Sequence, residues 1–383
     1  MKMRVIIKIV LAILIVVTML QCKKPYEPAV LTKADNYLVV DGYINTSAGG
    51  VSNIILSRTK SLTDTVINIA EHGATVTIQS NAGATYSLSE NGNNGNYTSS
   101  ALLLNATAQY KLFIKTNNGG QYQSDFVSVK PTPPIDSINW VQNSKAVNLY
   151  ANTHDATNAA RYYRWSYVQT WEYHSQLTSI WGVANGMAYA KNSGENVDTC
   201  YYVKQSTSIL LANSAALSQD VISNAPLATF LQGDSTLQYR SSFLVTQYAL
   251  TPSAYFYWQI IQKNSQQLGT LFDLQPSQLE GNLHSVSNPS EPVVGFVSAT
   301  NAQEKRIFIN GKDLQGWPSP FEGSYNCSLV NVAVNQSNFL IIDYPDTSYA
   351  PYYYVTSGPL VMAKKTCLDC RLSGGVTTKP SFW

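Results

Sequence analysis

Cysteine chemistry is the most distinctive feature of this sequence. Two of its five cysteines stand in the segment Cys367-Leu368-Asp369-Cys370, a spacing used by redox-active thiols and by zinc sites. A redox centre needs this motif at a strand-to-helix turn, and the sequence predicts no such turn here. A zinc site needs two further ligands, and the sequence offers no second pair. We therefore predict two structural disulfides, with a metal site, a redox centre and free thiols as the alternatives. The disulfide candidates are Cys200, Cys327, Cys367 and Cys370, and the sequence leaves their three connectivities open.

The histidines and acidic residues form no recognisable catalytic motif. None of the four histidines, His72, His154, His174 and His284, stands at a metal-binding spacing. The glycine-rich phosphate loops and the GxSxG nucleophile motif are missing from the sequence. We predict a non-enzymatic protein with no catalytic residues, no cofactor and no metal. An envelope hydrolase remains an alternative, because a pair of catalytic carboxylates from distant strands leaves no local pattern.

Aromatic residues are concentrated between positions 161 and 181, where they permit two interpretations. Exposed aromatic rings stack on sugars, whereas alternating Trp and Tyr also fill the core of a β-sandwich with their polar tips at its edge. We favour the core, and the ligand-binding residues stay unknown. The residues concerned are Trp165, Tyr167, Trp171, Tyr173 and Trp181.

The N-terminal segment is typical of an export signal. Basic residues within the first eight positions precede the apolar run Ile9–Leu20, which is shorter than the roughly 20 residues of a stable membrane span. Cys22 follows directly, as in a bacterial lipobox, where the thiol is acylated after cleavage. We predict a signal peptide at 1–21, lipidation of Cys22 and a tether at 22–34. A plain secreted protein and a retained membrane anchor are the alternatives.

Composition and charge exclude several classes of protein. The 383 residues are 44% hydrophobic and only 13% charged, which excludes a disordered chain and a coiled coil. Loss of the predicted signal peptide would leave 22 basic and 23 acidic residues, because Lys2, Arg4 and Lys8 lie within it. Nucleic acid is therefore not an expected partner. Low charge with much Tyr, Thr, Ser and Asn favours a β-rich protein outside the cytoplasm, where disulfides are stable.

Period-two hydrophobicity predicts a mainly β fold with two domains. Short alternating segments with turn residues between them fill 35–130, which we predict to be an immunoglobulin-like β-sandwich, with Gly42 at a bulge. Three prolines at 131–135 predict a stiff linker. A larger β-rich domain with a few helices is expected at 136–383. The expected strands include 37–44, 74–80, 85–88, 110–115, 122–129, 161–171, 242–249 and 338–344.

Helical segments are few. Thr251 can cap a helix over 251–264, in which Pro252 suits the first helical position. A shorter helix is expected at 214–222. The terminal Phe382-Trp383 is expected to pack against the protein, because a free tail seldom ends in two large aromatic residues.

Several segments in order resemble a known family. They are CKKPYEP from residue 22, LVVDGYI from 38, RYYRWSYVQTWEY from 161, CYYVKQSTSILL from 200, LFDLQPSQLEGNLHSVSNPSEPVVGFVSA from 271 and CLDCRLSGGVTTKPSFW from 367. This series resembles the Bacteroidota outer-membrane lipoprotein family catalogued as domain of unknown function 4249. The resemblance covers nearly the whole mature chain.

What the resemblance implies is a location and a partner, not a reaction. Genes of such lipoproteins often neighbour TonB-dependent receptors, so the resemblance implies an accessory or substrate-binding partner of a TonB-dependent barrel. It also implies attachment to the outer membrane through lipid on Cys22, on either the periplasmic or the surface face. A structural or adhesion surface lipoprotein is the alternative. The small-molecule ligand stays unknown.

Overall fold

Alternating apolar and polar residues produce most of the elements of this molecule. The computed structural model describes residues 36–60, 69–184, 187–266, 281–317, 327–332, 334–335, 340–341, 348–354 and 359–383. On strand β4 (Thr75–Ser80), Val76 and Ile78 are buried and the residues between them are less so, as the period of two predicts. Strands greatly outnumber helices, and the prediction of a mainly β protein is confirmed.

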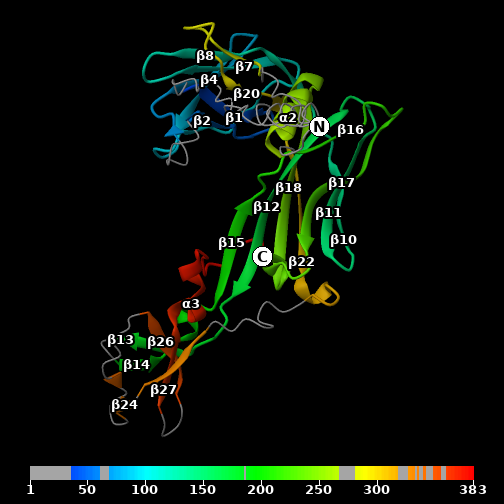
Figure 1. Ribbon diagram of the computed structural model, residues 1–383. Coiled ribbons are helices and arrows are strands. Elements are labelled where there is room, and N and C mark those ends of the chain that lie inside the picture. The colour runs from blue at the N-terminus through cyan, green and yellow to red at the C-terminus, as the bar shows by residue number, and fades with distance from the viewer. Residues whose placement is uncertain are drawn as a thin grey trace, which may run out of the picture.

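Three β units follow one another along the molecule (Figure 1). In the first unit the pairing order β7-β4-β5-β6-β2-β1-β21-β9 closes into a ring, because β9 also pairs with β7. Leu38, Ile54 and Leu112 are fully buried inside it. Its strands are β1 (Leu38–Asn45), β2 (Asn53–Arg58), β3 (Ile69–Ala70), β4, β5 (Thr85–Glu90), β6 (Asn96–Ser99), β7 (Gln109–Lys115), β8 (Gln121–Ser124), β9 (Val127–Lys130), β19 (Leu283–Ser285), β20 (Val294–Gly295) and β21 (Ala299–Thr300).

The second unit consists of two packed sheets. One has the order β10-β11-β17 and the other β15-β12-β18-β22, with β16 also paired to β12. Trp165, Phe243 and Val147 lie in the core between them. The elements are β10 (Ile135–Gln142), β11 (Ala146–Asp155), β12 (Tyr162–His174), β15 (Thr199–Gln205), β16 (Leu210–Asn213), β17 (Asp220–Leu231), β18 (Arg240–Leu250), β22 (Gln303–Asn310) and the 3-10 helices η2 (Ser235–Leu237) and η3 (Gly311–Asp313).

The third unit is the smallest and lies at the opposite end of the molecule from β1 (Figure 1). It has the sheets β13-β14-β25-β24 and β23-β27-β26. Its elements are β13 (Trp181–Ala184), β14 (Met187–Ala190), η1 (Ser193–Glu195), β23 (Leu329–Val332), β24 (Val334–Asn335), β25 (Leu340–Ile341), β26 (Tyr349–Tyr354), β27 (Leu360–Lys364), α3 (Lys365–Leu368) and η4 (Cys370–Ser373). Of the strand expected at 338–344, only β25 lies within the described residues.

The sequence places the start of the second domain at residue 136, but the division between the first two units is not a single point in the chain. Strands β19, β20 and β21 come from the second half of the chain but join the first unit, where β20 and β21 pair with β1 in parallel. The chain therefore passes between the two units more than once. The predicted linker at 131–135 lies within this crossing, since the Thr132 N–H donates to Asn301 Oδ1 at 2.7 Å and the Ala249 N–H donates to Thr132 Oγ1 at 2.9 Å. Thr132 is buried, so the connector is part of a packed joint.

Helix α2 (Pro252–Gln266) confirms the helix expected from residue 251. The Ala254 N–H donates to the Thr251 hydroxyl at 3.2 Å, which is the predicted cap. On the helix itself, the side chains of Ala254 and Tyr257 are buried. No helix among the described residues is long and apolar enough to cross a membrane.

Two local predictions are wrong. The segment 214–222 is a turn followed by the start of β17, because the Ser214 hydroxyl donates to the buried Asp220 and Arg161 donates to the Ser214 and Leu217 carbonyls. These hydrogen bonds hold the turn and prevent a helical ladder. Gly42 lies in unbroken register with Ile54 and is not a bulge. Its φ of +136° and an approach of 2.3 Å between a built Cβ and Asn53 O explain the glycine instead.

The C-terminal aromatic residues pack against the second unit, as predicted. Val376 forms an antiparallel bridge with Tyr201 on β15, and the Trp383 ring lies 5.2 Å from the Tyr201 ring. Trp383 also contacts Phe308 on β22, with 6.0 Å between ring centroids, and the Arg306 guanidinium lies 3.5 Å from the Phe382 ring centroid. The tail therefore crosses the outer face of this sheet from β15 to β22.

Candidate functional site

Strand β12 sends its side chains to two different environments. Tyr163 and Trp165 point into the core of the second unit, where both are buried. Arg164 lies between them in sequence and therefore points to the opposite face, toward α2 and the first unit. This alternation brings one arginine to the joint between the units.

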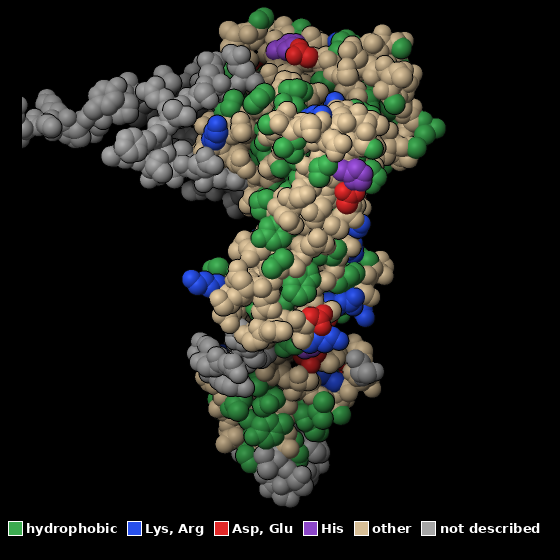
Figure 2. Space-filling view, turned by 90° about the vertical axis from the view of Figure 1, so that its right-hand side faces the viewer, with side chains coloured by type: hydrophobic (Ala, Val, Ile, Leu, Met, Phe, Trp, Pro, Cys, Tyr) green, Lys and Arg blue, Asp and Glu red, His purple; other side chains and the backbone are tan. Residues whose placement is uncertain are grey.

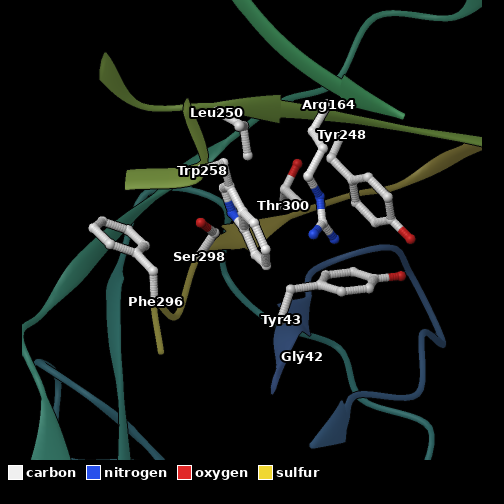
Figure 3. Close-up of a pocket in the computed structure, with 9 residues that line it drawn as sticks. All are labelled: Gly42, Tyr43, Arg164, Tyr248, Leu250, Trp258, Phe296, Ser298 and Thr300. Carbon is white, nitrogen blue, oxygen red and sulfur yellow. The ribbon is translucent and has the colours of Figure 1, made fainter. Parts of the chain in front are cut away.

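A small pocket surrounds Arg164 at this joint (Figure 3). Its empty space of about 260 Å³ includes open solvent, and the room for a bound molecule is about that of one water. The first unit contributes β1 and the segment after β20, and the second unit contributes β12, β18 and the adjoining helix α2. The lining residues are Gly42, Tyr43, Arg164, Tyr248, Leu250, Trp258, Phe296, Ser298 and Thr300.

Aromatic rings flank the guanidinium of Arg164. Its central carbon lies 4.2 Å from the Trp258 ring centroid and 4.9 Å from that of Tyr248. Tyr43 packs edge-on against Tyr248 with 5.0 Å between centroids. Figure 3 shows the guanidinium between Trp258 and Tyr248, with the Tyr43 ring next to it. Three rings from three different elements thus converge on one cation.

The electrostatics of the pocket are those of a partly buried cation. Burial lowers the pKa of Arg164, against the opposite influence of Tyr248, Asp41 and Tyr43. Burial also raises the pKa of the Tyr43 hydroxyl, so that Tyr43 is a neutral hydrogen-bonding group. Among the described residues, no carboxylate forms an ion pair with Arg164.

Arg164 is only partly buried, so it bears only part of the cost of removing a guanidinium from water. Each of the two cation–π contacts returns about 0.5–2 kcal/mol. The Thr300 hydroxyl, which also lines the pocket, donates its hydrogen bond to the Lys130 carbonyl at 2.7 Å. Chemically, the pocket offers planar N–H donors between aromatic walls, an arrangement suited to recognising an anionic group.

The four disulfide candidates form two disulfides, and the CxxC segment does not close on itself. Cys370 is bonded to Cys200 on β15, and Cys367 in α3 is bonded to Cys327 just before β23. The Cα–Cα distances are 5.8 Å and 6.0 Å. One short segment is therefore fixed to both the second and the third unit, a structural role that agrees with the prediction.

The histidines lie apart from one another, each beside a single carboxylate. The nitrogen–oxygen distances are 3.1 Å for His72–Glu90, 2.8 Å for His154–Asp136, 2.7 Å for His174–Glu172 and 3.8 Å for His284–Asp125. In the described part of the chain, no group of three or more His, Cys, Asp or Glu residues is placed to hold a metal ion.

The aromatic residues singled out from the sequence separate into different settings. Trp165 is buried in the core and Tyr167 packs against it, as the core interpretation predicts. Trp171 stacks on Tyr202 of β15 with 5.4 Å between centroids. Trp181 belongs to the third unit. The proposed lipid site, Cys22, lies outside the described residues.

Arg164 is the site residue that the sequence argument missed. The available signal was the second of the two arginines in the aromatic segment RYYRWSYVQTW, the one that lies within the strand. Alternation places it on the face opposite to Trp165, but it does not reveal what covers that face. The covering residues Tyr43 and Trp258 are about 120 and 90 positions away in the sequence, beyond the reach of any local pattern.

Comparisons with known proteins identify the family. Among solved structures, the chain is similar to a proposed carbohydrate-binding protein from Bacteroides uniformis, with 15% sequence identity over 56% of this chain and 90% of that one. The TM-score is 0.16, too low to support any functional argument. A search of the curated proteins gives no match. The model of the family described as domain of unknown function (DUF4249) matches residues 23–306, and the chain belongs to this family.

Proposed function

We propose that this protein is a lipid-anchored, non-enzymatic partner of a TonB-dependent transporter at the outer membrane. Cys22 would carry the lipid, and residues 22–34 would link it to β1 in the first unit. The resemblance described from the sequence, which implies an outer-membrane lipoprotein beside a TonB-dependent receptor, supports this proposal. A membrane anchor confines a protein to two dimensions, which raises its effective concentration near a barrel without requiring tight affinity.

The elongated arrangement of the three units is the observation that carries this proposal. The described chain begins in the first unit, and the third unit lies at the other end (Figure 1). Figure 2 shows hydrophobic side chains gathered over this far end. Exposed large hydrophobic residues of the third unit include Ile180, Tyr189, Leu329 and Tyr353, here called the distal apolar residues. Exposed apolar groups gathered in this way are typical of interaction surfaces.

Co-purification with distal variants tests the proposal. Wild-type protein extracted in mild detergent should recover a TonB-dependent barrel at close to one-to-one stoichiometry. The triple variant Ile180→Asp, Leu329→Asp, Tyr353→Asp should lose the barrel, because charged groups cannot be buried in an apolar contact without a large cost. Leu103→Asp is the matched control, since Leu103 is an exposed leucine of the first unit.

Retention of both disulfides in the triple variant would show that its third unit is still folded. Recovery of the wild-type protein alone, in a detergent that preserves another envelope complex, would contradict the proposal. It would favour the structural or adhesion alternative.

A further inference from the structure

We propose that the two disulfides form a redox-sensitive relay, in which reduction of Cys327–Cys367 allows Cys367 to displace Cys200 from Cys370. The product is a Cys367–Cys370 bond, and the covalent link between the second and third units is lost. The co-reactant is an external dithiol. The relay does not depend on the proposed transporter partnership, and it is tested on the isolated protein.

The two bonds differ in their exposure to solvent. Cys200 and Cys370 are completely buried. Cys367 is also buried, but its partner Cys327 is only half-buried. A thiolate must reach a sulfur atom to exchange with it, so exposure decides which bond reacts first. The Cys327–Cys367 bond is therefore the entry point, and Cys327 is the sulfur that an external thiolate reaches.

Attack at Cys327 places a thiolate on Cys367. When the dithiol forms a bond to Cys327 Sγ, the Cys327–Cys367 bond breaks and its electron pair stays on Cys367 Sγ. The second thiol of the reagent then closes the reagent to a cyclic disulfide and leaves Cys327 as a free thiol. One proton of the dithiol passes to Cys327 and the other to water. The dithiol is oxidised by two electrons, and the protein disulfide is reduced by two.

Cys367 and Cys370 stand at the two ends of a tight turn. Leu368 is helical, and Asp369 is extended with φ of −128° and ψ of 102°. A helical residue followed by an extended one is the conformation of a type VIII turn, whose first and fourth Cα atoms lie less than about 7 Å apart. Disulfides join Cα atoms that are about 4.4–6.8 Å apart. Attack of Cys367 on Cys370 therefore needs only a small movement of the backbone.

Hydrogen bonds hold this turn independently of the disulfides. The Leu177 N–H donates to the Cys367 carbonyl at 2.9 Å, and the Cys370 N–H donates to the Val197 carbonyl at 2.9 Å. The pairing of β23 with β27 also survives reduction, because it consists of main-chain hydrogen bonds. Cys367 and Cys370 therefore stay close to each other after the Cys327–Cys367 bond opens.

The exchange step moves the remaining bond without any further reductant. The Cys367 thiolate forms a bond to Cys370 Sγ and the Cys200–Cys370 bond breaks. The electron pair leaves on Cys200 Sγ, which takes a proton from water. The link between β15 and η4 then consists of noncovalent contacts, among them the hydrogen bond from the Tyr202 hydroxyl to the Cys370 carbonyl at 3.0 Å.

Reduction of the folded wild-type protein tests the relay. The protein is treated with one equivalent of dithiothreitol, quenched with acid and labelled with N-ethylmaleimide in denaturant, and its bonds are mapped by mass spectrometry. We expect label on Cys327 first and on Cys200 afterwards, together with a new Cys367–Cys370 bond. Circular dichroism before the quench checks that the protein is still folded.

The matched control is the double variant Cys327→Ser, Cys367→Ser, which keeps Cys200–Cys370 but lacks the attacking thiol. Its remaining bond should be reduced at least about tenfold more slowly than the Cys200 thiol appears in the wild type, because Cys367 attacks at the high effective concentration of an intramolecular group. The single variant Cys327→Ser keeps the attacking thiol and should contain a Cys367–Cys370 bond without added reductant.

Three results would overturn the proposal. The first is label on Cys327 and Cys367 while Cys200–Cys370 stays intact, which is the behaviour of two independent structural bonds. The second is reduction of Cys200–Cys370 as fast in the double variant as in the wild type. The third is a Cys327→Ser protein that keeps Cys200–Cys370 and a free Cys367.

Discussion

Cys200 on β15 is covalently bonded to Cys370 in η4 across 170 residues of sequence. Cys367, three residues before Cys370, is bonded to Cys327, which lies just before β23 of the third unit. The C-terminal segment is thus fastened between the second and third units. Gly375 fits this crowded place, because an added Cβ would lie 2.6 Å from the Cys200 Cβ.

Disulfide mapping should recover the pairs Cys200–Cys370 and Cys327–Cys367 by mass spectrometry of non-reduced peptides. Replacing both Cys200 and Cys370 with serine should lower the free energy of unfolding by about 2–5 kcal/mol, because the unfolded chain regains a long loop. Urea titration measures this change. A Cys367–Cys370 bond, or four free thiols, would contradict the described connectivity.

Trp383→Ala should weaken the attachment of the tail to the second unit. The ring contacts Tyr201, Phe308 and Arg240, so its loss should cost about 2 kcal/mol of unfolding free energy. Val141→Ala, at an exposed position of the same unit, should change stability by less than about 0.5 kcal/mol. Rapid removal of Trp383 by carboxypeptidase under native conditions would argue against a packed tail.

Gly42→Ala should destabilise the first unit more than Gly83→Ala does. Both glycines have positive φ. A Cβ at Gly42 would lie 2.3 Å from Asn53 O, whereas a Cβ at Gly83 would have no other atom within 4 Å. Gly83→Ala should cost about 1 kcal/mol for the backbone conformation alone, and Gly42→Ala about 3 kcal/mol or more. Thermal unfolding of the two variants compares them, and equal losses would show that the close approach is relieved at no cost.

Asp155→Asn should make the protein less sensitive to acid. Burial opposes ionisation of Asp155, but the N–H groups of Ala160, Thr157 and Ala159 and the Thr157 hydroxyl bring its pKa below the usual value. A lowered carboxyl pKa stabilises the fold above the unfolded-state pKa of about 4, and this stabilisation is lost as the pH falls through the folded-state value.

The stability gap between wild type and Asp155→Asn should therefore be constant near neutral pH and should shrink as the pH falls below about 4. Urea titrations at several pH values measure the gap, with Asp125→Asn, at an exposed carboxylate, as the control. A gap that does not change with pH would show that the carboxylate charge is not what stabilises this turn.

Local patterns predict the elements of this protein better than their assembly. Alternation at Val76 and Ile78 identifies β4, and the Thr251-Pro252 pair identifies the start of α2. The helix predicted from residue 214 does not form, because Ser214 is held in a turn by hydrogen bonds with Arg161 and Asp220. Sequence patterns report the local preferences of a segment, and these contacts override them.

Long-range pairing explains why the units and the pocket could not be predicted. Ala299 joins β1 beside Ile44 in parallel, a pairing across more than 250 residues that leaves no local signal. The Arg164 pocket depends on this pairing, because the same segment supplies Ser298 and Thr300. The cysteine candidates were identified correctly, since their chemistry depends on residue type and compartment, but their connectivity depends on the fold.

Site-specific photo-crosslinking in intact cells tests the central claim most directly. A photoreactive amino acid at Tyr353 places the probe on the third unit, and the same group at Leu103 places it on the first. The account predicts that the probe at position 353 crosslinks to a TonB-dependent barrel and that the probe at position 103 does not. Crosslinking of the barrel from neither position, with the protein correctly lipidated and folded, would contradict the account.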